Sequence, residues 1–250
     1  MQNSIIVITG ASAGIGAALA EVVHARGAVP VLAARRQDRL ADVALRSGNA
    51  LTLVADVTSR AAVQQVVRDV LAAHGRIDVW VNNVGQGISR PPSELTDEDI
   101  DQVMRVNVMS ALYGMQEVLP HFKARGRGHI VNVSSMLGRI PFATFRSAYC
   151  AAKHFLNALT TTFRAEVQAT HPEIQISLVS PGVVRTEFGV NALHGGPDSR
   201  QLPHSQSAEE VATVIADVIA SRRADVYTRA GAAAQIASYY ATLGEDPSRA

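Results

Sequence analysis

The chain has 250 residues, 47 % of them hydrophobic and 18 % charged, a composition typical of a globular protein with a large core and not of a disordered chain. Its 23 basic and 22 acidic side chains are spread along the chain and leave a net charge of +1, so we expect no broad basic surface for nucleic acid. The one cysteine, Cys150, cannot form an intramolecular disulfide, and no cluster of Cys and His has the spacing of zinc ligands.

Short apolar runs alternate with longer helical patterns along the whole chain. The first run, residues 5–8, is apolar and β-branched throughout, which is typical of a buried parallel strand. This alternation predicts an α/β protein with a central parallel sheet of about seven strands flanked by helices. The predicted elements are a strand at 5–8, a helix at 17–26, a strand at 29–34, a helix at 37–46, a strand at 51–55, a helix at 59–74, a strand at 79–81, a helix at 96–124, a strand at 129–133, a helix at 147–170, a strand at 174–179, a helix at 208–221, a strand at 225–227 and a helix at 232–243.

Three residues indicate where these helices begin and end. Ser59 is a suitable N-cap, and Thr96 stands before a run of three acidic residues, which favours a helix start. Pro120 lacks a backbone N–H, so we expect it to kink the helix at 96–124 or to end it early.

Residues 189–207 differ from the rest of the chain because they contain four Gly and Pro residues after Gly189 and little apolar periodicity. A long irregular segment in a compact domain is often functional, so we predict a mobile loop beside the substrate. We find no internal repeat and no linker, and therefore expect one domain over residues 1–250.

No apolar run approaches the ~18 residues that a membrane span needs. The first four residues carry no basic n-region and lead directly into the first predicted strand, so they do not resemble a signal peptide. We therefore expect a cytoplasmic protein that does not bind membranes.

A glycine-rich turn follows the first predicted strand. Residues 9–16 read Thr-Gly-Ala-Ser-Ala-Gly-Ile-Gly and are followed by a helix. Glycines at such a turn let a pyrophosphate approach the backbone closely, and the N-terminus of the following helix attracts it. Many turns need glycine, so this cluster indicates a dinucleotide site mainly through its place between a strand and a helix.

Together with six further motifs, this turn resembles the short-chain dehydrogenase/reductase family in its compact form. Each motif stands at the carboxyl end of a predicted strand or on an adjacent helix, the edge where open α/β sheets bind ligands. The family's usual Asn-Asn-Ala-Gly reads Asn-Asn-Val-Gly here. The resemblance implies a single, doubly wound Rossmann-type domain. The further motifs are Asp56-Val57, Asn82-Asn83-Val84-Gly85, Asn107, Ser134-Ser135, Tyr149-Cys150-Ala151-Ala152-Lys153 and Pro181-Gly182-Val183-Val184-Arg185-Thr186.

Tyr149 and Lys153 are four residues apart on a predicted helix and therefore share a face. At ~4 Å and an effective dielectric constant of ~20, an ammonium would stabilise a phenolate by at most ~4 kcal/mol, or ~3 pKa units. We therefore expect Lys153 to lower the pKa of Tyr149 towards neutrality. Lys123 is the only other lysine, so a lysine at 153 suggests a need for a compact ammonium.

The resemblance assigns four residues to catalysis. It implies that Ser135 orients the substrate oxygen, that Tyr149 transfers the proton, and that Lys153 binds the nicotinamide ribose and lowers the pKa of Tyr149. Asn107 is implied to hold a water that relays protons. We choose Ser135 over Ser134 because Gly138 follows Ser135 by three residues, as in the family, and because only one of the two faces the site.

The end of the second predicted strand decides which cofactor we expect. It reads Ala33-Ala34-Arg35-Arg36 and lacks the acid that would accept from the 2′-hydroxyl of NAD. An arginine pairs instead with a 2′-phosphate. We therefore predict NADP(H), with Arg35 as the main contact and Arg36 as the second.

The remaining contacts are implied by the resemblance or by the composition of the loops. Predicted cofactor-binding residues are Gly10, Ser12, Ala13, Gly14, Ile15, Gly16, Arg35, Arg36, Asp56, Val57, Asn83, Val84, Gly85, Tyr149, Lys153, Pro181, Gly182, Val184 and Thr186. Predicted substrate-binding residues are Ser135, Leu137, Phe142, Phe145, Tyr149, Val183, Phe188 and Leu193, which suggest a mainly apolar pocket. Four basic side chains near these loops could also reach an anionic group, although each is more often a solvated charge: Arg90, Arg139, Arg146 and His194.

The leading interpretation is an NADP(H)-dependent enzyme that interconverts a carbonyl and a secondary alcohol on a small molecule. One alternative is a non-catalytic protein of the same fold that senses NADP(H), which has no need of Ser135, Tyr149 and Lys153 together. Another is an epimerase or dehydratase of the extended family type, for which the chain is short. The resemblance also implies a homodimer or homotetramer. The spacing of Cys and His predicts no metal site.

Overall fold

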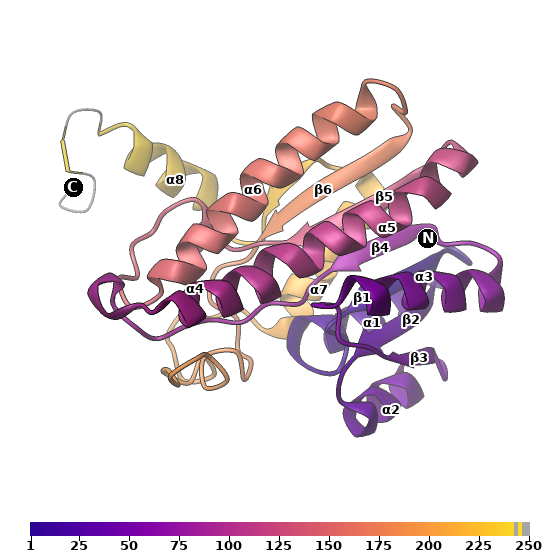
Figure 1. Ribbon diagram of the computed structural model, residues 1–250, viewed down its shortest axis with the longest axis horizontal. Coiled ribbons are helices and arrows are strands. Elements are labelled where there is room, and N and C mark those ends of the chain that lie inside the picture. Colours follow the sequence, from indigo (N-terminus) through magenta and orange to yellow (C-terminus); the bar gives the residue numbers. More distant parts are fainter. Residues whose placement is uncertain (243–244, 247–250) are drawn as a thin grey trace.

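The computed structural model describes residues 1–242 and 245–246, and its centre is a seven-stranded sheet in the order β3-β2-β1-β4-β5-β6-β7 (Figure 1). Every pairing of neighbouring strands is parallel. The predicted α/β fold with a doubly wound parallel sheet is therefore confirmed. The strands are β1 (Ile5–Thr9), β2 (Val29–Ala34), β3 (Leu51–Val54), β4 (Val79–Asn82), β5 (Gly128–Val133), β6 (Ile174–Ser180) and β7 (Asp225–Tyr227).

Helices cover both faces of the sheet (Figure 1). The helical elements are α1 (Gly14–Ala25), α2 (Gln37–Arg46), α3 (Arg60–His74), η1 (Pro92–Glu94), α4 (Asp97–Met104), η2 (Arg105–Met109), α5 (Ser110–Arg125), η3 (Met136–Gly138), α6 (Ser147–Gln168), α7 (Ala208–Ser221) and α8 (Ala232–Tyr240). Side chains of α1, α2 and α7 form one apolar cluster with the sheet, and side chains of α3, α5 and α6 form another.

Strand β1 shows why a sheet covered on both faces needs continuous apolar runs. Ile6 and Ile8 belong to the cluster with α1 and α7, whereas Ile5 and Val7 belong to the opposite cluster. Successive side chains of a strand point to opposite faces, so both sets are buried. Fully burying one such side chain stabilises the fold by about 1.5–3 kcal/mol.

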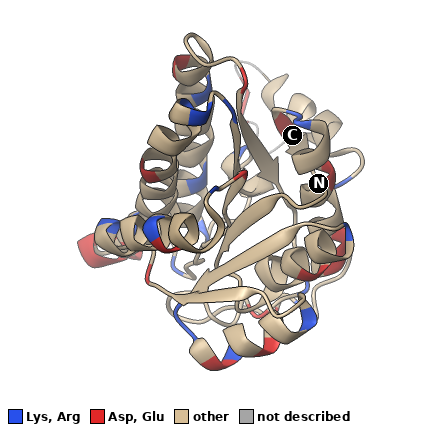
Figure 2. Cartoon of the chain, turned by 90° about the vertical axis from the view of Figure 1, so that its right-hand side faces the viewer, with Lys and Arg blue, Asp and Glu red and all other residues tan. Residues whose placement is uncertain are grey.

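The charged side chains lie mostly on the outer faces of the helices. Figure 2 shows the blue and red residues mixed along these faces, while the sheet between them is tan. None of the helices in the part of the chain that the structure describes is long and apolar enough to cross a bilayer.

The single helix predicted at 96–124 is wrong, and Pro120 does not end the helix early. It is divided into α4, a π-helical turn η2 and α5, and it continues through Pro120 to Arg125. Val118 and Phe122, on either side of Pro120, are fully buried, and packing of this kind outweighs the lost backbone hydrogen bond. Gly126 ends the helix with a φ of 70°.

The other helix boundaries differ from the prediction by a few residues. Ser59 and Thr96 are N-caps as predicted, and each side chain accepts a backbone N–H. Helix α1 begins at Gly14 rather than at residue 17, because the glycine turn leads directly into it. Helix α8 ends at Tyr240, and Leu243, the predicted last residue, lies outside the described residues.

Candidate active site

The carboxyl ends of β1, β4, β5 and β6 lie next to one another, because these strands are parallel neighbours in the sheet. The glycine turn follows β1, residues 83–85 follow β4, Ser134 and Ser135 follow β5, and residues 181–186 follow β6. The fold thus gathers motifs that are far apart in the sequence along one edge of the sheet.

The glycine turn is held in a narrow conformation. Gly10 and Gly14 have φ values of 68° and 53°, which favour glycine. A Cβ on Gly16 would lie 2.4 Å from the carbonyl oxygen of Gly10, so only glycine lets α1 begin this close to β1. A Cβ on Gly14 would lie 3.1 Å from the side chain of Thr186, which places the segment after β6 over the turn.

Asn83, the first residue after β4, is hydrogen-bonded to the same turn. Its side-chain Nδ2 donates to the carbonyl oxygens of Thr9 (3.1 Å) and Gly10 (3.4 Å), and its backbone N–H donates to Thr9 Oγ1 (3.1 Å). The side chain of Asn83 is therefore committed to positioning the backbone of the turn.

The two serines after β5 have different surroundings. Ser134 Oγ donates to Asn157 Oδ1 at 2.5 Å in the interior. Ser135 Oγ accepts from the backbone N–H of Leu137 at 3.1 Å, and the Ser135 hydroxyl lies close enough to the Tyr149 phenol to lower its pKa. The structure therefore brings Ser135, and not Ser134, together with Tyr149.

Lys153 lies one helical turn beyond Tyr149 on α6, with Nζ 5.7 Å from the centre of the phenol ring. Both side chains are buried, and Nζ donates to the carbonyl oxygen of Val133 at 3.0 Å. Burial lowers the pKa of Lys153 to about 8.

The expectation that the pKa of Tyr149 falls towards neutrality is wrong for the structure described here. Burial raises the pKa of Tyr149 above its usual value, and the nearby Ser135 hydroxyl only partly opposes this. The attraction between the two charges, taken alone, would lower the pKa of Tyr149, but desolvation disfavours the charged form of both groups. Tyr149 is therefore a protonated phenol at neutral pH.

Asn107 is fully buried in the π-helical turn η2. Its Nδ2 donates to the carbonyl oxygens of Gln86 and Val103, both at 2.9 Å, and its Oδ1 accepts from the backbone N–H of Gln86 at 3.1 Å. A Cβ on Gly85 would lie 3.1 Å from Asn107 Oδ1 and 3.6 Å from Lys153 Nζ. Asn107 thus fixes the backbone after β4 close to Lys153, and π-turns of this kind are frequent at functional sites.

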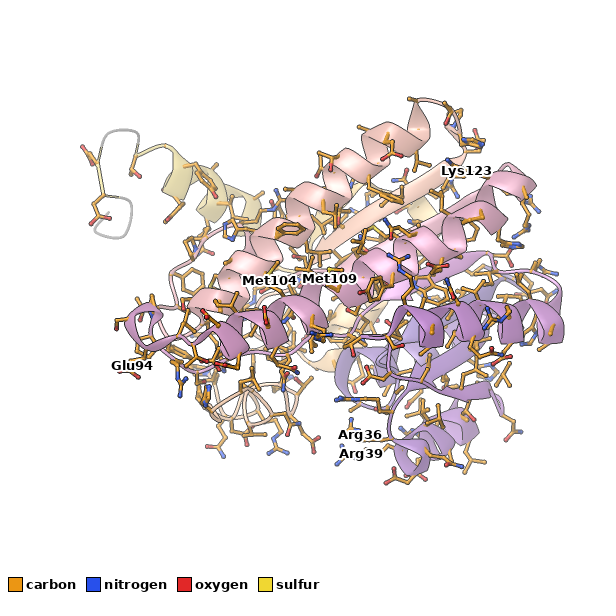
Figure 3. The ribbon with its side chains drawn as sticks, viewed as in Figure 1. Arg36, Arg39, Glu94, Met104, Met109 and Lys123 are labelled. Atoms are coloured by element: carbon orange, nitrogen blue, oxygen red, sulfur yellow. The ribbon has the colours of Figure 1, made fainter. Side chains whose placement is uncertain are left out.

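Arg36 and Arg39 lie at the start of α2, which follows β2 (Figure 3). Arg36 donates from Nε and Nη2 to Ser12 Oγ at 3.3 and 3.1 Å, which ties it to the glycine turn. Arg35 is exposed and makes no hydrogen bond or ion pair within the described part of the chain. Asp56 follows β3. Its Oδ1 accepts hydrogen bonds from the backbone N–H of Thr58 at 3.0 Å and from the Thr58 hydroxyl at 2.8 Å.

Apolar side chains cover Tyr149. The ring of Phe188 meets the Tyr149 ring edge-on with centroids 5.4 Å apart, and Leu137 and Leu193 pack against the same cluster. The other predicted substrate residues are more open: Phe142, Phe145 and Val183 are among the large apolar side chains that stay exposed.

The segment 189–207 lacks helix and extended strand, as expected, but it is attached to the chain after β4. Leu193 exchanges backbone hydrogen bonds of 2.9 Å with Gly87 and Ser89. His194 Nε2 lies 2.7 Å from Asp99 Oδ1 at the start of α4. The predicted mobility of this loop stays a prediction.

Comparisons with known proteins agree on one family. The family model described as short chain dehydrogenase matches residues 4–195. The chain belongs to the short-chain dehydrogenase/reductase family.

Relatives and solved structures cover nearly the whole chain of this short-chain dehydrogenase/reductase. It is 33 % identical to dehydrogenase/reductase SDR family member 7B of Danio rerio, over 97 % of this chain and 82 % of that protein. A Burkholderia phymatum short-chain dehydrogenase/reductase in complex with NAD matches with a TM-score of 0.89 at 28 % identity, over 98 % of this chain and 96 % of that one. A metagenomic short-chain oxidoreductase in complex with NADP matches with a TM-score of 0.73 at 31 % identity, over 92 % and 93 %.

A nicotinamide dinucleotide, the cofactor that the family implies, fits the residues present. The turn carries no side chain at Gly10, Gly14 and Gly16, and it leads into the N-terminus of α1, where backbone N–H groups attract a phosphate. Lys153 Nζ has three N–H donors and uses one of them within the described residues, so two are left for hydroxyl groups. Within the described ranges, no group of three His, Cys, Asp or Glu residues is placed to hold a metal ion.

Two features of this short-chain dehydrogenase/reductase were missed from the sequence. Arg39 Nη1 lies 2.8 Å from Glu187 Oε2 and so links α2 to the segment after β6. Asp99 binds both Arg90 and His194, at 2.7 Å each. The i, i+3 spacing of Arg36 and Arg39 would have placed both on one helix face, but no local pattern reveals an acid that is 148 residues away.

Proposed function

We propose that this family member is an NADP(H)-dependent oxidoreductase that interconverts a carbonyl and a secondary alcohol on a mainly apolar small molecule. The observation that carries the proposal is that Ser135, the buried Tyr149 phenol and the buried Lys153 ammonium lie together at one edge of the sheet. A non-catalytic sensor of NADP(H) would not need these three groups together.

Tyr149 acts as the general acid in the direction of reduction. Its raised pKa keeps the phenol protonated at neutral pH, so a proton is available for the substrate oxygen. Ser135 orients that oxygen against the phenol. The bound cofactor supplies or accepts the hydride.

Lys153 provides the positive charge next to the phenol. With a pKa of about 8 it is mostly charged at neutral pH. Once the proton leaves, this charge stabilises the phenolate more strongly than it would in water, because the pair is buried. The two free N–H groups of Nζ hold the nicotinamide ribose.

The preference for NADP(H) rests on the arginines after β2. No acid stands at the end of β2, and Arg36 bonds to Ser12 within the glycine turn. We assign the 2′-phosphate to Arg35, with Arg36 as its second contact. The solved relatives described above include one in complex with NAD and one in complex with NADP, so they support a nicotinamide cofactor of either kind.

A fluorescence titration with NADPH and NADH side by side tests this assignment. We expect the wild type to bind NADPH at least ~10-fold more tightly, a difference that one charge-assisted pair supplies. R35D and R36D should each shift the preference towards NADH, whereas R127D, at an exposed position on the opposite edge of the sheet, should leave it unchanged. Tighter binding of NADH by the wild type would discard the arginine assignment and keep the oxidoreductase.

The assembly and location expected from the sequence stay proposals. A homodimer or homotetramer is expected from the family, and light scattering on the purified protein measures it. A cytoplasmic location is likewise a proposal.

A further inference from the structure

Among the four basic side chains near the substrate loops that the sequence singled out, Arg146 alone has no acidic partner in the described part of the chain. Of the four candidates named from the sequence, Arg90 and His194 both bind Asp99, and Arg139 forms an ion pair with Asp225. Arg146 makes no ion pair with any residue that the structure describes. It is also the most buried of the four, with 7 % of its surface exposed.

The guanidinium of Arg146 lies in a space left open by two glycines. Nη1 donates to the carbonyl oxygen of Ile88 at 3.1 Å, and a Cβ on Gly87 would lie 2.6 Å from the same nitrogen. A Cβ on Gly196 would lie 3.0 Å from Nη2 and 2.8 Å from Ser89 Oγ. Gly87 and Gly196, which are far apart in the sequence, therefore leave room for this guanidinium.

Several hydrogen-bond donors at this place lack an acceptor. Arg146 Nε and Nη2 bond to no residue in the described ranges, and neither atom is sealed from solvent. The hydroxyl of Ser89, beside Nη2, is buried without a partner. The guanidinium also lies over the ring of Phe145, 5.2 Å from its centre. Because a buried hydroxyl is normally paired, the unpaired Ser89 beside a cation with two solvent-accessible nitrogens indicates that an acceptor belongs here.

Arg146 is close to the reacting groups. It precedes α6 and stands one helical turn before Tyr149, and its charge acts on the phenol. A Cβ on Gly87 would lie 3.1 Å from Phe188, whose ring meets that of Tyr149. A small molecule held at Tyr149 therefore lies within reach of the guanidinium.

Lys153 offers a comparison within the same helix. Arg146 and Lys153 are the two buried Arg or Lys side chains among the described residues, and neither is paired with a carboxylate. For Lys153, the proposed partner is the cofactor. We infer that Arg146 binds a carboxylate of the substrate, so the substrate is an apolar carbonyl compound that carries an acid group.

This inference rests on the proposed function and narrows its substrate class. The planar guanidinium matches a carboxylate in a two-pronged hydrogen bond. Phe188, Leu137 and Leu193 pack against the apolar cluster that contains Tyr149. An aromatic or short aliphatic aldehyde or ketone with a carboxylate at its far end combines these features.

Matched aldehydes with and without the charge test the inference. The probes are para- and meta-carboxybenzaldehyde and their methyl esters, reduced with NADPH. We expect kcat/KM for the better acid to exceed that for its ester by roughly 10- to 100-fold, as for one buried charge-assisted pair. In R146Q this acid-to-ester ratio should fall by a similar factor, mainly through KM. R146K, which can still donate to Ile88, should keep part of the ratio.

R90Q is the control. It removes a neighbouring positive charge that Asp99 already neutralises, so the acid-to-ester ratio should change by no more than ~2-fold. A wild-type ratio near one, with both aldehydes reduced, would overturn the inference and leave the oxidoreductase in place. An equal loss for acid and ester in both R146Q and R146K would also overturn it, because Arg146 would then only hold Ile88.

A binding measurement separates this inference from the proposed function. Calorimetric titration of para-(hydroxymethyl)benzoate and its methyl ester into the protein with NADP⁺ needs no turnover. Tighter binding of the acid, lost in R146Q, supports the carboxylate site even where neither aldehyde is reduced. Equal binding of acid and ester, or no binding of either, contradicts it.

Discussion

The two ends of the candidate site differ in how they hold their charges. At the reaction end, Tyr149, Lys153 and Arg146 are buried, and Lys153 and Arg146 each donate one hydrogen bond to a backbone carbonyl. The other end, where we propose that the adenosine part of the cofactor binds, is called the adenosine end. There, Arg36 and Arg39 lie at the surface at the start of α2, beside Glu187. Burial lowers the pKa of Lys153 to about 8 and raises the pKa of Tyr149. At the surface, the hydrogen bond with Glu187 is the largest influence on Arg39 and raises its pKa.

This difference has a consequence for mutation. A buried group has few partners and no water to replace them, so its loss is not compensated. Exposed charges are screened and can substitute for one another. Single substitutions should therefore have large effects at the reaction end and small ones at the adenosine end.

The largest effect is expected for Y149F. It removes the phenol proton while keeping the ring against Phe188, so kcat should fall by roughly 10²–10⁴-fold, the usual contribution of a positioned acid. NADPH affinity should stay near that of the wild type. Steady-state kinetics and fluorescence titration measure the two quantities.

Y113F is the matched control for that change. Tyr113 lies on α5 beneath the guanidinium of Arg60, 4.5 Å from the ring centre, and outside the site. The kcat of Y113F should equal that of the wild type. Near-normal turnover in Y149F would remove the role of Tyr149 and favour the sensor interpretation.

An intermediate effect is expected in the pH dependence of stability. The pKa of Lys153 is about 8 in the folded chain and 10.5 when solvated, so between these values the unfolded chain binds more protons. The free energy of unfolding of the wild type should therefore rise relative to K153M by about 2 kcal/mol from pH 8 to pH 9.5. The raised pKa of Tyr149 acts with the opposite sign only above about pH 10. Urea unfolding of the wild type and K153M at several pH values measures this difference in the free energy of unfolding.

Lys123, the only other lysine, supplies the control (Figure 3). It is exposed near the end of α5, so K123M should give a stability curve parallel to that of the wild type. If the K153M curve is parallel as well, the ammonium of Lys153 is not desolvated in the folded protein.

The fold was predictable because its signals are local. Apolar runs such as residues 5–8 mark strands buried on both faces, and Ser59 and Thr96 mark helix starts through a hydroxyl that accepts a nearby N–H. Pro120 misled because the burial of Val118 and Phe122, which keeps the helix intact, depends on the tertiary structure. The π-turn around Asn107 likewise has no local pattern.

The site was predictable only where motifs stand at strand ends. The sequence placed Ser135, Tyr149 and Lys153 at one edge, but the sign of the Tyr149 pKa shift depends on burial, which the spacing of two residues does not contain. The unpaired state of Arg146 was equally hidden, because it follows from where Asp99 and Asp225 direct their carboxylates.

The smallest effect is expected for E187Q at the adenosine end. Glu187 neutralises Arg39 and also acts on Arg36 and Arg200, so its removal leaves more positive charge for a phosphate. NADPH should bind ~2- to 5-fold more tightly, as for one exposed pair, and the gain should fade with added salt. E166Q, at an exposed position on α6, should change nothing. A large change in NADPH affinity in E187Q would mean that the Arg39–Glu187 pair controls access to the cofactor site, and that the two ends of the site differ less than their exposure suggests.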